Sequence, residues 1–121
     1  MTAARQCLGR LGERLAAEHL ERLGFHIIGR NHRTRYGELD LVACDEQRIV
    51  FVEVKARRSG PGRPLDKLDW RKQGQVRRMA RSWLVETTDR PHRTDVRFDA
   101  IGVTVDASGR LLALEHLEAA F

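Results

Sequence analysis

The fold is decided by the stretch from Glu38 to Arg57, which reads ELDLVAC (38–44), DEQR (45–48) and IVFVEVKAR (49–57). Two runs rich in apolar and β-branched residues on either side of a short polar connection predict a β-hairpin. If residues 45–48 form the loop, Cys44 faces Ile49 and Val42 faces Phe51.

The same register brings charged residues together further from the loop. Asp40 then faces Glu53, and Glu38 faces Lys55; because side chains alternate between the faces of a strand, all four are expected on one face. Two opposed carboxylates repel each other. A divalent cation such as Mg²⁺, which binds one or two carboxylates together with water and phosphate oxygens, would stabilise the pair. A shared proton, or neutralisation by Lys55 and Arg57, would do the same.

An ordinary solvent-facing strand surface with a Glu–Lys cross-strand pair is the alternative interpretation of these residues. Val42 and Phe51 share the face, so it is not simply polar, and Gly37 allows close approach of the backbone. A lysine two residues after Glu53 can also stabilise negative charge at a phosphate during hydrolysis. The pattern therefore favours a functional site.

The rest of the chain predicts a mixed α/β fold. Helical periodicity covers residues 3–23 and stops at Gly24, and it returns after the Gly/Pro-rich loop Ser59–Pro64. The expected elements are a helix (3–23), a strand (25–28), a basic loop (30–37), the hairpin, a helix (65–86) and two strands (96–105 and 111–117). This order predicts one sheet flanked by helices in a single domain, residues 1–121.

Composition limits the class of protein. The chain of 121 residues has the length of one domain, and it carries 22 Lys and Arg against 17 Asp and Glu, a net charge of +5. It contains neither an apolar run near the ~20 residues of a membrane span nor the apolar stretch of a secretory signal. We therefore expect a cytoplasmic protein that does not enter membranes, and the basic balance favours a nucleic-acid partner.

The segments GELDLVA (37–43) and VFVEVK (50–55) resemble the core of the PD-(D/E)XK, or restriction-endonuclease-like, nucleases. Nearly the whole chain resembles the uncharacterised YraN-like family, which is similar in fold to archaeal Holliday junction resolvases. Leu39 stands where the name of the motif has proline. Weaker matches to that family are Gly12-Glu13, Gly24-Phe25, the helix with Lys72, Arg97-Phe98-Asp99 and Ala120-Phe121.

The resemblance implies a restriction-endonuclease-like core and a role for each motif residue. Asp40 and Glu53 correspond to carboxylates that hold Mg²⁺ or Mn²⁺, with the backbone carbonyl of Val54 as a further ligand. Lys55 corresponds to the catalytic lysine. Glu13 matches a glutamate of the first helix that helps to hold the metal in resolvase-like members; a solvated helix glutamate is the alternative.

Other polar residues have two interpretations each. Glu38 is expected to support the site as the partner of Lys55. Lys72 lies on the apolar face of the second helix, so it either contacts a phosphate near the sheet or extends past the core to solvent. Arg35 and Arg57 belong either to a phosphate track or to a solvated surface. Tyr36 and Trp70 are expected either to stack on unpaired bases or to be partly buried, and Asp99 is expected to form a structural ion pair.

The sequence thus predicts a metal-dependent nuclease acting on nucleic acid, with DNA as the expected substrate. By analogy with the resolvases, the substrate is branched or contains single strands and the enzyme is a homodimer. The alternative is a nucleic-acid-binding or assembly protein that has the nuclease fold without physiological cleavage. Glycoside hydrolysis by two carboxylates leaves Lys55 and the basic surface unexplained.

Overall fold

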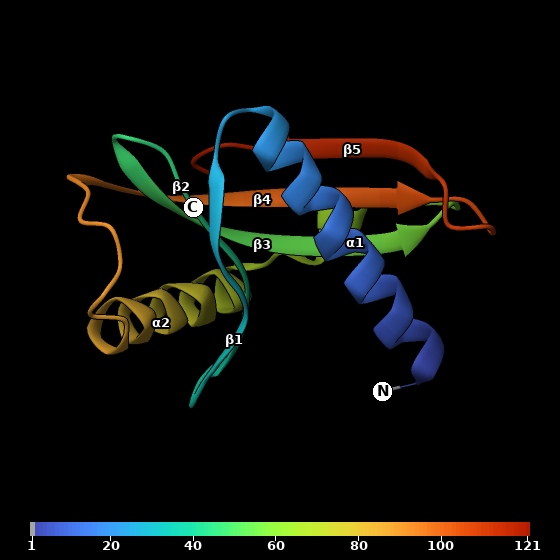
Figure 1. The fold of residues 1–121 in the computed structure, drawn as a ribbon. Coiled ribbons are helices and arrows are strands. Elements are labelled where there is room, and N and C mark those ends of the chain that lie inside the picture. Colours follow the sequence, from blue (N-terminus) through green and yellow to red (C-terminus); the bar gives the residue numbers. More distant parts are fainter. Residues whose placement is uncertain (1) are drawn as a thin grey trace.

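The computed structural model describes residues 2–121 as one five-stranded mixed sheet between two helices (Figure 1). The strand order is β1-β2-β3-β4-β5, with β3 and β4 parallel and the other neighbours antiparallel. The predicted mixed α/β architecture is confirmed. The elements are α1 (Ala3–Arg22), β1 (His26–Thr34), β2 (Gly37–Cys44), β3 (Arg48–Arg58), η1 (Pro64–Lys67), α2 (Trp70–Glu86), β4 (Asp95–Val105) and β5 (Leu111–Leu117).

Side-chain caps fix where the helices begin. Thr2 caps α1, because its hydroxyl accepts a hydrogen bond from the Arg5 N–H at 3.2 Å. Asp69 caps α2 in the same way by accepting from the Lys72 N–H at 3.0 Å. The second helix therefore begins at Trp70, and the expectation of one helix from residue 65 was wrong. Pro64–Lys67 form a separate short 3₁₀ turn.

The helices cover opposite faces of the sheet, and β3 contributes to both faces by alternation. Val50 and Val52 pack toward α1, in a cluster with Ala16, Ala17 and Leu20. Ile49 and Phe51 pack toward α2, in a cluster with Val76, Met79 and Trp83. Since β3 is buried on both faces and joined to β4 through α2, it forms the centre of the fold. Within residues 2–121, neither helix has the length and apolar character needed to cross a membrane.

The segment from Arg30 to Gly37 is not the loop that its polar composition predicted. Strand β1 runs to Thr34 and pairs with β2, which leaves only Arg35 and Tyr36 in the turn. The Thr34 hydroxyl closes this turn, donating to the Gly37 carbonyl at 2.9 Å and accepting from the Tyr36 N–H at 3.0 Å. Because β1 lies at an edge of the sheet, exposed polar side chains along it are compatible with a strand, and composition alone was misleading.

Close packing of α1 on the sheet depends on Gly12. A Cβ atom at this position would lie 2.5 Å from Cβ of Ala56. Gly12→Ala is therefore expected to destabilise the fold by about 1–2 kcal/mol, because the cost of overpacking exceeds the helix propensity gained. Gly9→Ala is the matched control: no atom lies within 4 Å of its added Cβ, so it should stabilise by up to about 1 kcal/mol. Urea unfolding of both variants measures the difference, and equal effects would contradict this packing.

Candidate metal centre

The candidate site lies where β2 and β3 stop pairing and separate, a place called the fork below. The predicted register is confirmed from Cys44–Ile49 to Leu41–Val52, where the ladder ends. Beyond this point the Val54 N–H donates to Oδ2 of Asp40 at 2.8 Å. The carboxylate of Asp40 thus takes a bond that a β2 carbonyl would accept in a continuous ladder, and it lies in the fork between the strands.

The strict alternation of β2 breaks at Asp40. The β1–β2 ladder keeps one register from Arg30–Leu41 to His32–Leu39, with Asn31 and Asp40 unpaired between them, and the φ of Asn31 is +50°. Leu39 and Val42 accordingly both pack toward α2, whereas Leu41 packs toward α1. The expectation that Glu38, Asp40, Val42, Glu53 and Lys55 share one face was therefore wrong.

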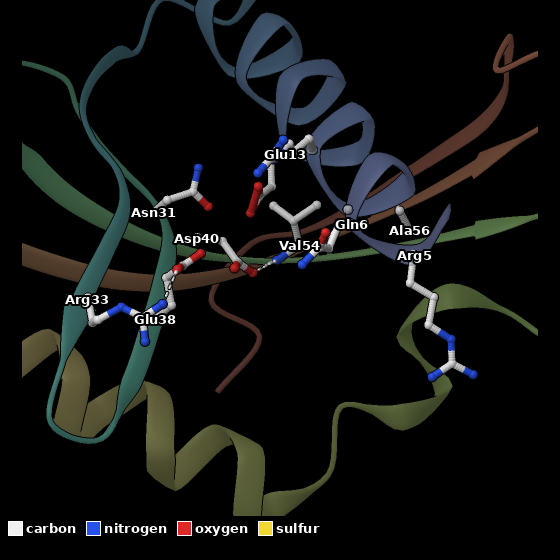
Figure 2. A pocket seen from close by; sticks show the side chains of 11 residues that line it. Arg5, Gln6, Glu13, Asn31, Arg33, Glu38, Asp40, Val54 and Ala56 are labelled. Atoms are coloured by element: carbon white, nitrogen blue, oxygen red, sulfur yellow. Dashed lines mark hydrogen bonds and ion pairs between the residues drawn. The ribbon is translucent and has the colours of Figure 1, made fainter. Parts of the chain in front are cut away.

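Glu38 and Asp40 instead line a cavity of about 550 Å³ beside α1 (Figure 2). Glu13 enters this cavity from α1, and the three carboxylates each place one oxygen within 4.8 Å of the other two. With its amide nitrogen turned toward the acids, Asn31 donates to Glu38 at 2.9 Å and to Glu13 at 2.8 Å. Glu38 also pairs with Arg33 at 3.7 Å, so its predicted pairing with Lys55 is wrong.

Glu53 lies on the α2 side of the fork and is 2% exposed. Its Oε2 is 3.1 Å from Nζ of Lys72 and 3.7 Å from Nζ of Lys55, which makes Glu53 the counter-ion of both lysines. Neither contact has the geometry of a hydrogen bond, and this buried oxygen lacks a hydrogen-bond partner among residues 2–121. The prediction that Lys72 points toward the sheet is confirmed.

Asp40 interacts electrostatically with acids on both sides of the fork, Glu53 on the α2 side and Glu13 on the α1 side. Burial, together with the neighbouring carboxyl group of Glu53, raises the pKa of Asp40 well above its ordinary value, although the Val54 N–H acts in the opposite direction. Burial and the charge of Glu38 also raise the pKa of Glu13. These raised pKa values mean that holding the carboxylates together in their charged form costs free energy. A bound divalent cation would remove this cost, so the donor set fits a hard metal ion.

The raised pKa of Asp40 has a consequence for stability. A carboxyl group whose folded pKa lies above its unfolded value, ordinarily near 3.8, destabilises the folded state as pH rises through the folded pKa. In a metal-free buffer, Asp40→Asn is therefore expected to raise the midpoint of thermal unfolding by a few degrees near pH 8. The gain should shrink toward about pH 4, where Asp40 is protonated. Thermal unfolding curves of the wild type and Asp40→Asn in EDTA across this pH range measure the difference in midpoint. A variant that is less stable than the wild type at every pH would contradict the prediction.

Two predicted phosphate contacts lie away from the acidic cavity. Arg35 lies at the tip of the β1–β2 hairpin, with its Cζ 4.8 Å from the centre of the Tyr36 ring. Arg57 lies beside the Ser59–Pro64 loop, where a Cβ on Gly62 would be 2.8 Å from it. Trp70, the first residue of α2, is 74% exposed and therefore is not core. Val54 lines the cavity, as its expected role as a ligand requires.

Five polar residues that line the cavity were not among the predicted site residues: Arg5, Gln6, Arg10, Asn31 and Arg33. Arg5 and Arg10 were detectable, because Arg5 lies eight residues and Arg10 three residues before Glu13, and helical residues at these spacings share a face. Asn31 and Arg33 were hidden by the assignment of their segment to a loop.

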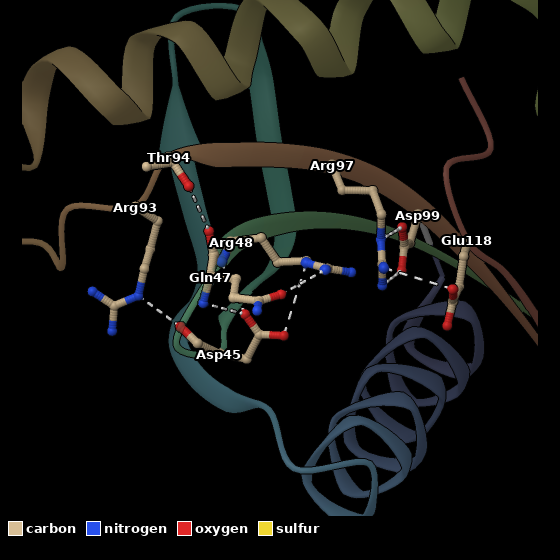
Figure 3. A network of polar contacts seen from close by, with 8 residues as sticks. All are labelled: Asp45, Gln47, Arg48, Arg93, Thr94, Arg97, Asp99 and Glu118. Carbon is tan, nitrogen blue, oxygen red and sulfur yellow. Dashed lines mark hydrogen bonds and ion pairs between the residues drawn. The ribbon is translucent and has the colours of Figure 1, made fainter.

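Asp99 lies on β4, on the face of the sheet that α1 covers, and has a structural role, as predicted (Figure 3). It is 0% exposed and accepts hydrogen bonds from Arg97 at 2.8 and 2.9 Å, from His116 at 2.8 Å and from the Ala119 N–H at 3.1 Å. Burial acts to raise the pKa of Asp99, but the hydrogen bonds from His116 and Arg97 outweigh burial and hold the pKa below its ordinary value. These partners tie β4, β5 and the C-terminal segment together.

Comparison with known proteins supplies a family. A sequence model of the uncharacterised protein family UPF0102 matches residues 12–103, which include Glu13, the fork and α2. The chain belongs to family UPF0102.

Other UPF0102 proteins match almost end to end. The protein of Acidothermus cellulolyticus is 46% identical over 110 residues, which cover 84% of this chain and 83% of that protein. The protein of Nocardia farcinica is 44% identical, with coverage of 97% and 91%. That of Pelotomaculum thermopropionicum is 43% identical over 122 residues, with both chains covered completely. The single unit described above is thus about the whole length of these UPF0102 relatives.

Proposed function

We propose that this UPF0102 protein is a metal-dependent nuclease of the PD-(D/E)XK type. The observation that carries the proposal is the fork, where Asp40 contacts Glu53 and Val54 while Lys55 lies 3.7 Å from Glu53. Two acids and a lysine from adjacent strands, beside an open cavity, are the donor set and the cation that phosphodiester hydrolysis needs.

Asp40 and Glu53 would hold Mg²⁺ or Mn²⁺, with the Val54 carbonyl and Glu13 as further ligands. When bound, such an ion supplies Lewis-acid stabilisation of phosphoryl oxygens and activates water for in-line attack. Glu38 and Asn31 position Glu13 through the contacts at the cavity wall. Arg5, Arg10 and Arg33, which line the same cavity, would attract the polyanionic backbone.

The two lysines on Glu53 would act differently. Lys55 follows Glu53 on the same strand, and its ammonium group would stabilise negative charge on the scissile phosphate. Lys72 lies closer to Glu53, at 3.1 Å, and offers a second contact to phosphate once the acid has turned toward a metal ion. Glu53 would hold the ion, and the two lysines that now pair with Glu53 would then be free to contact phosphate.

DNA with branches or single strands is the proposed substrate. The net charge of +5 favours a polyanion. Recognition would depend on backbone and shape, since the arginines at the cavity offer phosphate contacts rather than a base-reading element inserted in a groove. A homodimer in the cytoplasm is part of the same proposal, and the elution volume of the purified protein tests the dimer.

The test is a cleavage assay on purified protein with branched, flapped, single-stranded and fully duplex DNA. We expect products on at least one substrate with Mg²⁺ or Mn²⁺, none in EDTA, and none from an Asp40→Asn preparation made identically. This variant also controls for contaminating host nucleases. Equal cleavage by the two preparations, or no cleavage of any substrate with either metal, would overturn the proposal.

One observation favours a second function, nucleic-acid binding without turnover. Nζ of Lys72 lies 3.1 Å from Oε2 of Glu53, so this acid already has a cationic partner without a metal ion. In a binding module, metal ions leave affinity for DNA unchanged and Asp40→Asn binds as the wild type does. The same preparations, examined by filter binding, separate the two functions.

A further inference from the structure

A second hollow, here called the Tyr36 pocket, lies between the tip of the β1–β2 hairpin and α2. Its volume is about 290 Å³, near the lower end for small-ligand pockets, so it has room for one small planar group. Tyr36 and Val85 provide apolar surface. The cationic groups around it are Arg35, Arg78 and Arg81.

The charges of the Tyr36 pocket are unbalanced. Three guanidinium groups face one acid, Glu86, and Glu86 contacts His32 at 3.4 Å. The guanidinium carbons of Arg35 and Arg78 lie 4.8 and 5.8 Å from the centre of the Tyr36 ring. An aromatic ring bordered by guanidinium groups offers flat faces for stacking and donors for an anion in the same place.

The Tyr36 pocket is fixed relative to the metal centre by α2. The Gln75 side chain donates to the Tyr36 carbonyl at 2.6 Å, which holds the hairpin tip against this helix. Gly37 makes the close contact possible, because a Cβ there would lie 2.7 Å from Nε2 of Gln75 and φ is +132°. The same helix carries Lys72 at the metal centre and Arg78 at the pocket, about 9 Å further along its axis.

A nucleotide matches this chemistry. Its base is planar and apolar on both faces, and its phosphate is an anion that arginine binds in bidentate fashion. An axial rise of about 9 Å between Lys72 and Arg78 is comparable to roughly three steps of a stacked strand, or fewer if the strand is extended. A base within a duplex does not expose a face, so the pocket would accept only an unpaired base.

We propose that the Tyr36 pocket binds one unpaired nucleotide, a few steps from the phosphate at the metal centre, and so directs the protein to DNA that contains single-stranded segments. The position of this nucleotide relative to the cleaved bond rests on the proposed nuclease function. Binding of the unpaired nucleotide by Tyr36 and Arg78 does not depend on cleavage.

The experiment measures binding in EDTA, where cleavage does not occur. The probes are a fluorescein-labelled oligothymidylate of about ten nucleotides and a blunt duplex of the same length, read by fluorescence anisotropy. Tyr36→Leu and Arg78→Gln are each expected to weaken binding of the oligothymidylate about tenfold, while Tyr36→Leu leaves binding of the duplex unchanged. Arg14→Gln, on an exposed part of α1, is the control for loss of one positive charge and should bind both probes as the wild type does.

The outcomes separate this proposal from the nuclease proposal. Unchanged oligothymidylate binding by both pocket variants, or equal weakening for the two probes with Tyr36→Leu, would overturn the pocket even if the wild type cleaves DNA. Conversely, selective weakening in a protein that cleaves none of its substrates would support the pocket and overturn the nuclease. Circular dichroism of each variant confirms that it is folded before binding is compared.

Discussion

Glu53→Gln is expected to lower phosphodiester cleavage by at least about a thousandfold. The substitution preserves the size of this buried side chain while removing its negative charge, and with it the proposed metal ligand. It also removes the shared counter-ion of Lys55 and Lys72. The initial rate on the best substrate, measured at saturating Mg²⁺ and normalised to folded protein, gives the ratio.

Glu46→Gln is the matched control for this loss. Glu46 is an exposed acid in the turn that joins β2 to β3, at the end of the hairpin away from Asp40 and Glu53. The Glu46→Gln variant should therefore cleave at the wild-type rate. Retention of more than about a tenth of the activity by Glu53→Gln would place this acid outside the reacting centre. Restoration of its rate by raised Mn²⁺ concentration would support a role in holding the metal.

Asp99→Ala is expected to destabilise the protein by about 3–5 kcal/mol, a large share of the total stability of a domain of this size. The change leaves Arg97, which is mostly buried, without its bidentate partner. It also removes the acceptor for His116 and for the Ala119 N–H. Urea unfolding followed by the fluorescence of buried Trp83 measures the loss, and Asp99→Asn, which keeps an acceptor oxygen, should fall between the two proteins.

The lowered pKa of Asp99 predicts the pH range in which its carboxylate stabilises the fold. Because the folded pKa lies below the unfolded value, the charged group stabilises the fold above the ordinary value near 3.8 and loses this effect as pH falls through the folded pKa. The gap in stability between wild type and Asp99→Ala should therefore narrow in acid. Asp89→Ala, on an exposed turn, should stay within about 0.5 kcal/mol of the wild type. An equally small effect of Asp99→Ala would contradict the structural role.

Local patterns were sufficient to predict most of the fold. The apolar composition of 38–44 and 49–57 gave the hairpin and its register near the loop, because alternation and a four-residue connection leave one solution. The extent of β1 could not be predicted in this way. Its residues are polar because an edge strand exposes them, and pairing with β2 is a tertiary effect that composition does not record.

The candidate site was predicted in its residues but not in its arrangement. Asp40 neighbours Glu53, which pairs with Lys55 on the α2 side, and Glu13 joins Asp40 from α1 on the other side. Counting by two along β2 assigned Asp40 to the wrong face, because the alternation breaks between Leu39 and Leu41, which pack on opposite faces of the sheet. A break of this kind leaves almost no trace in one sequence, beyond an asparagine inside a strand.

The central claim is that Asp40 and Glu53 hold one divalent ion between them. Crystals of the wild type and of Asp40→Asn, soaked in Mn²⁺ under the same conditions, test it through anomalous scattering. We predict one strong peak in the fork of the wild type, in contact with both carboxylates and with the Val54 carbonyl, and no peak there in the variant. A wild-type fork without a peak at millimolar Mn²⁺, with Lys72 still paired to Glu53, would contradict the account.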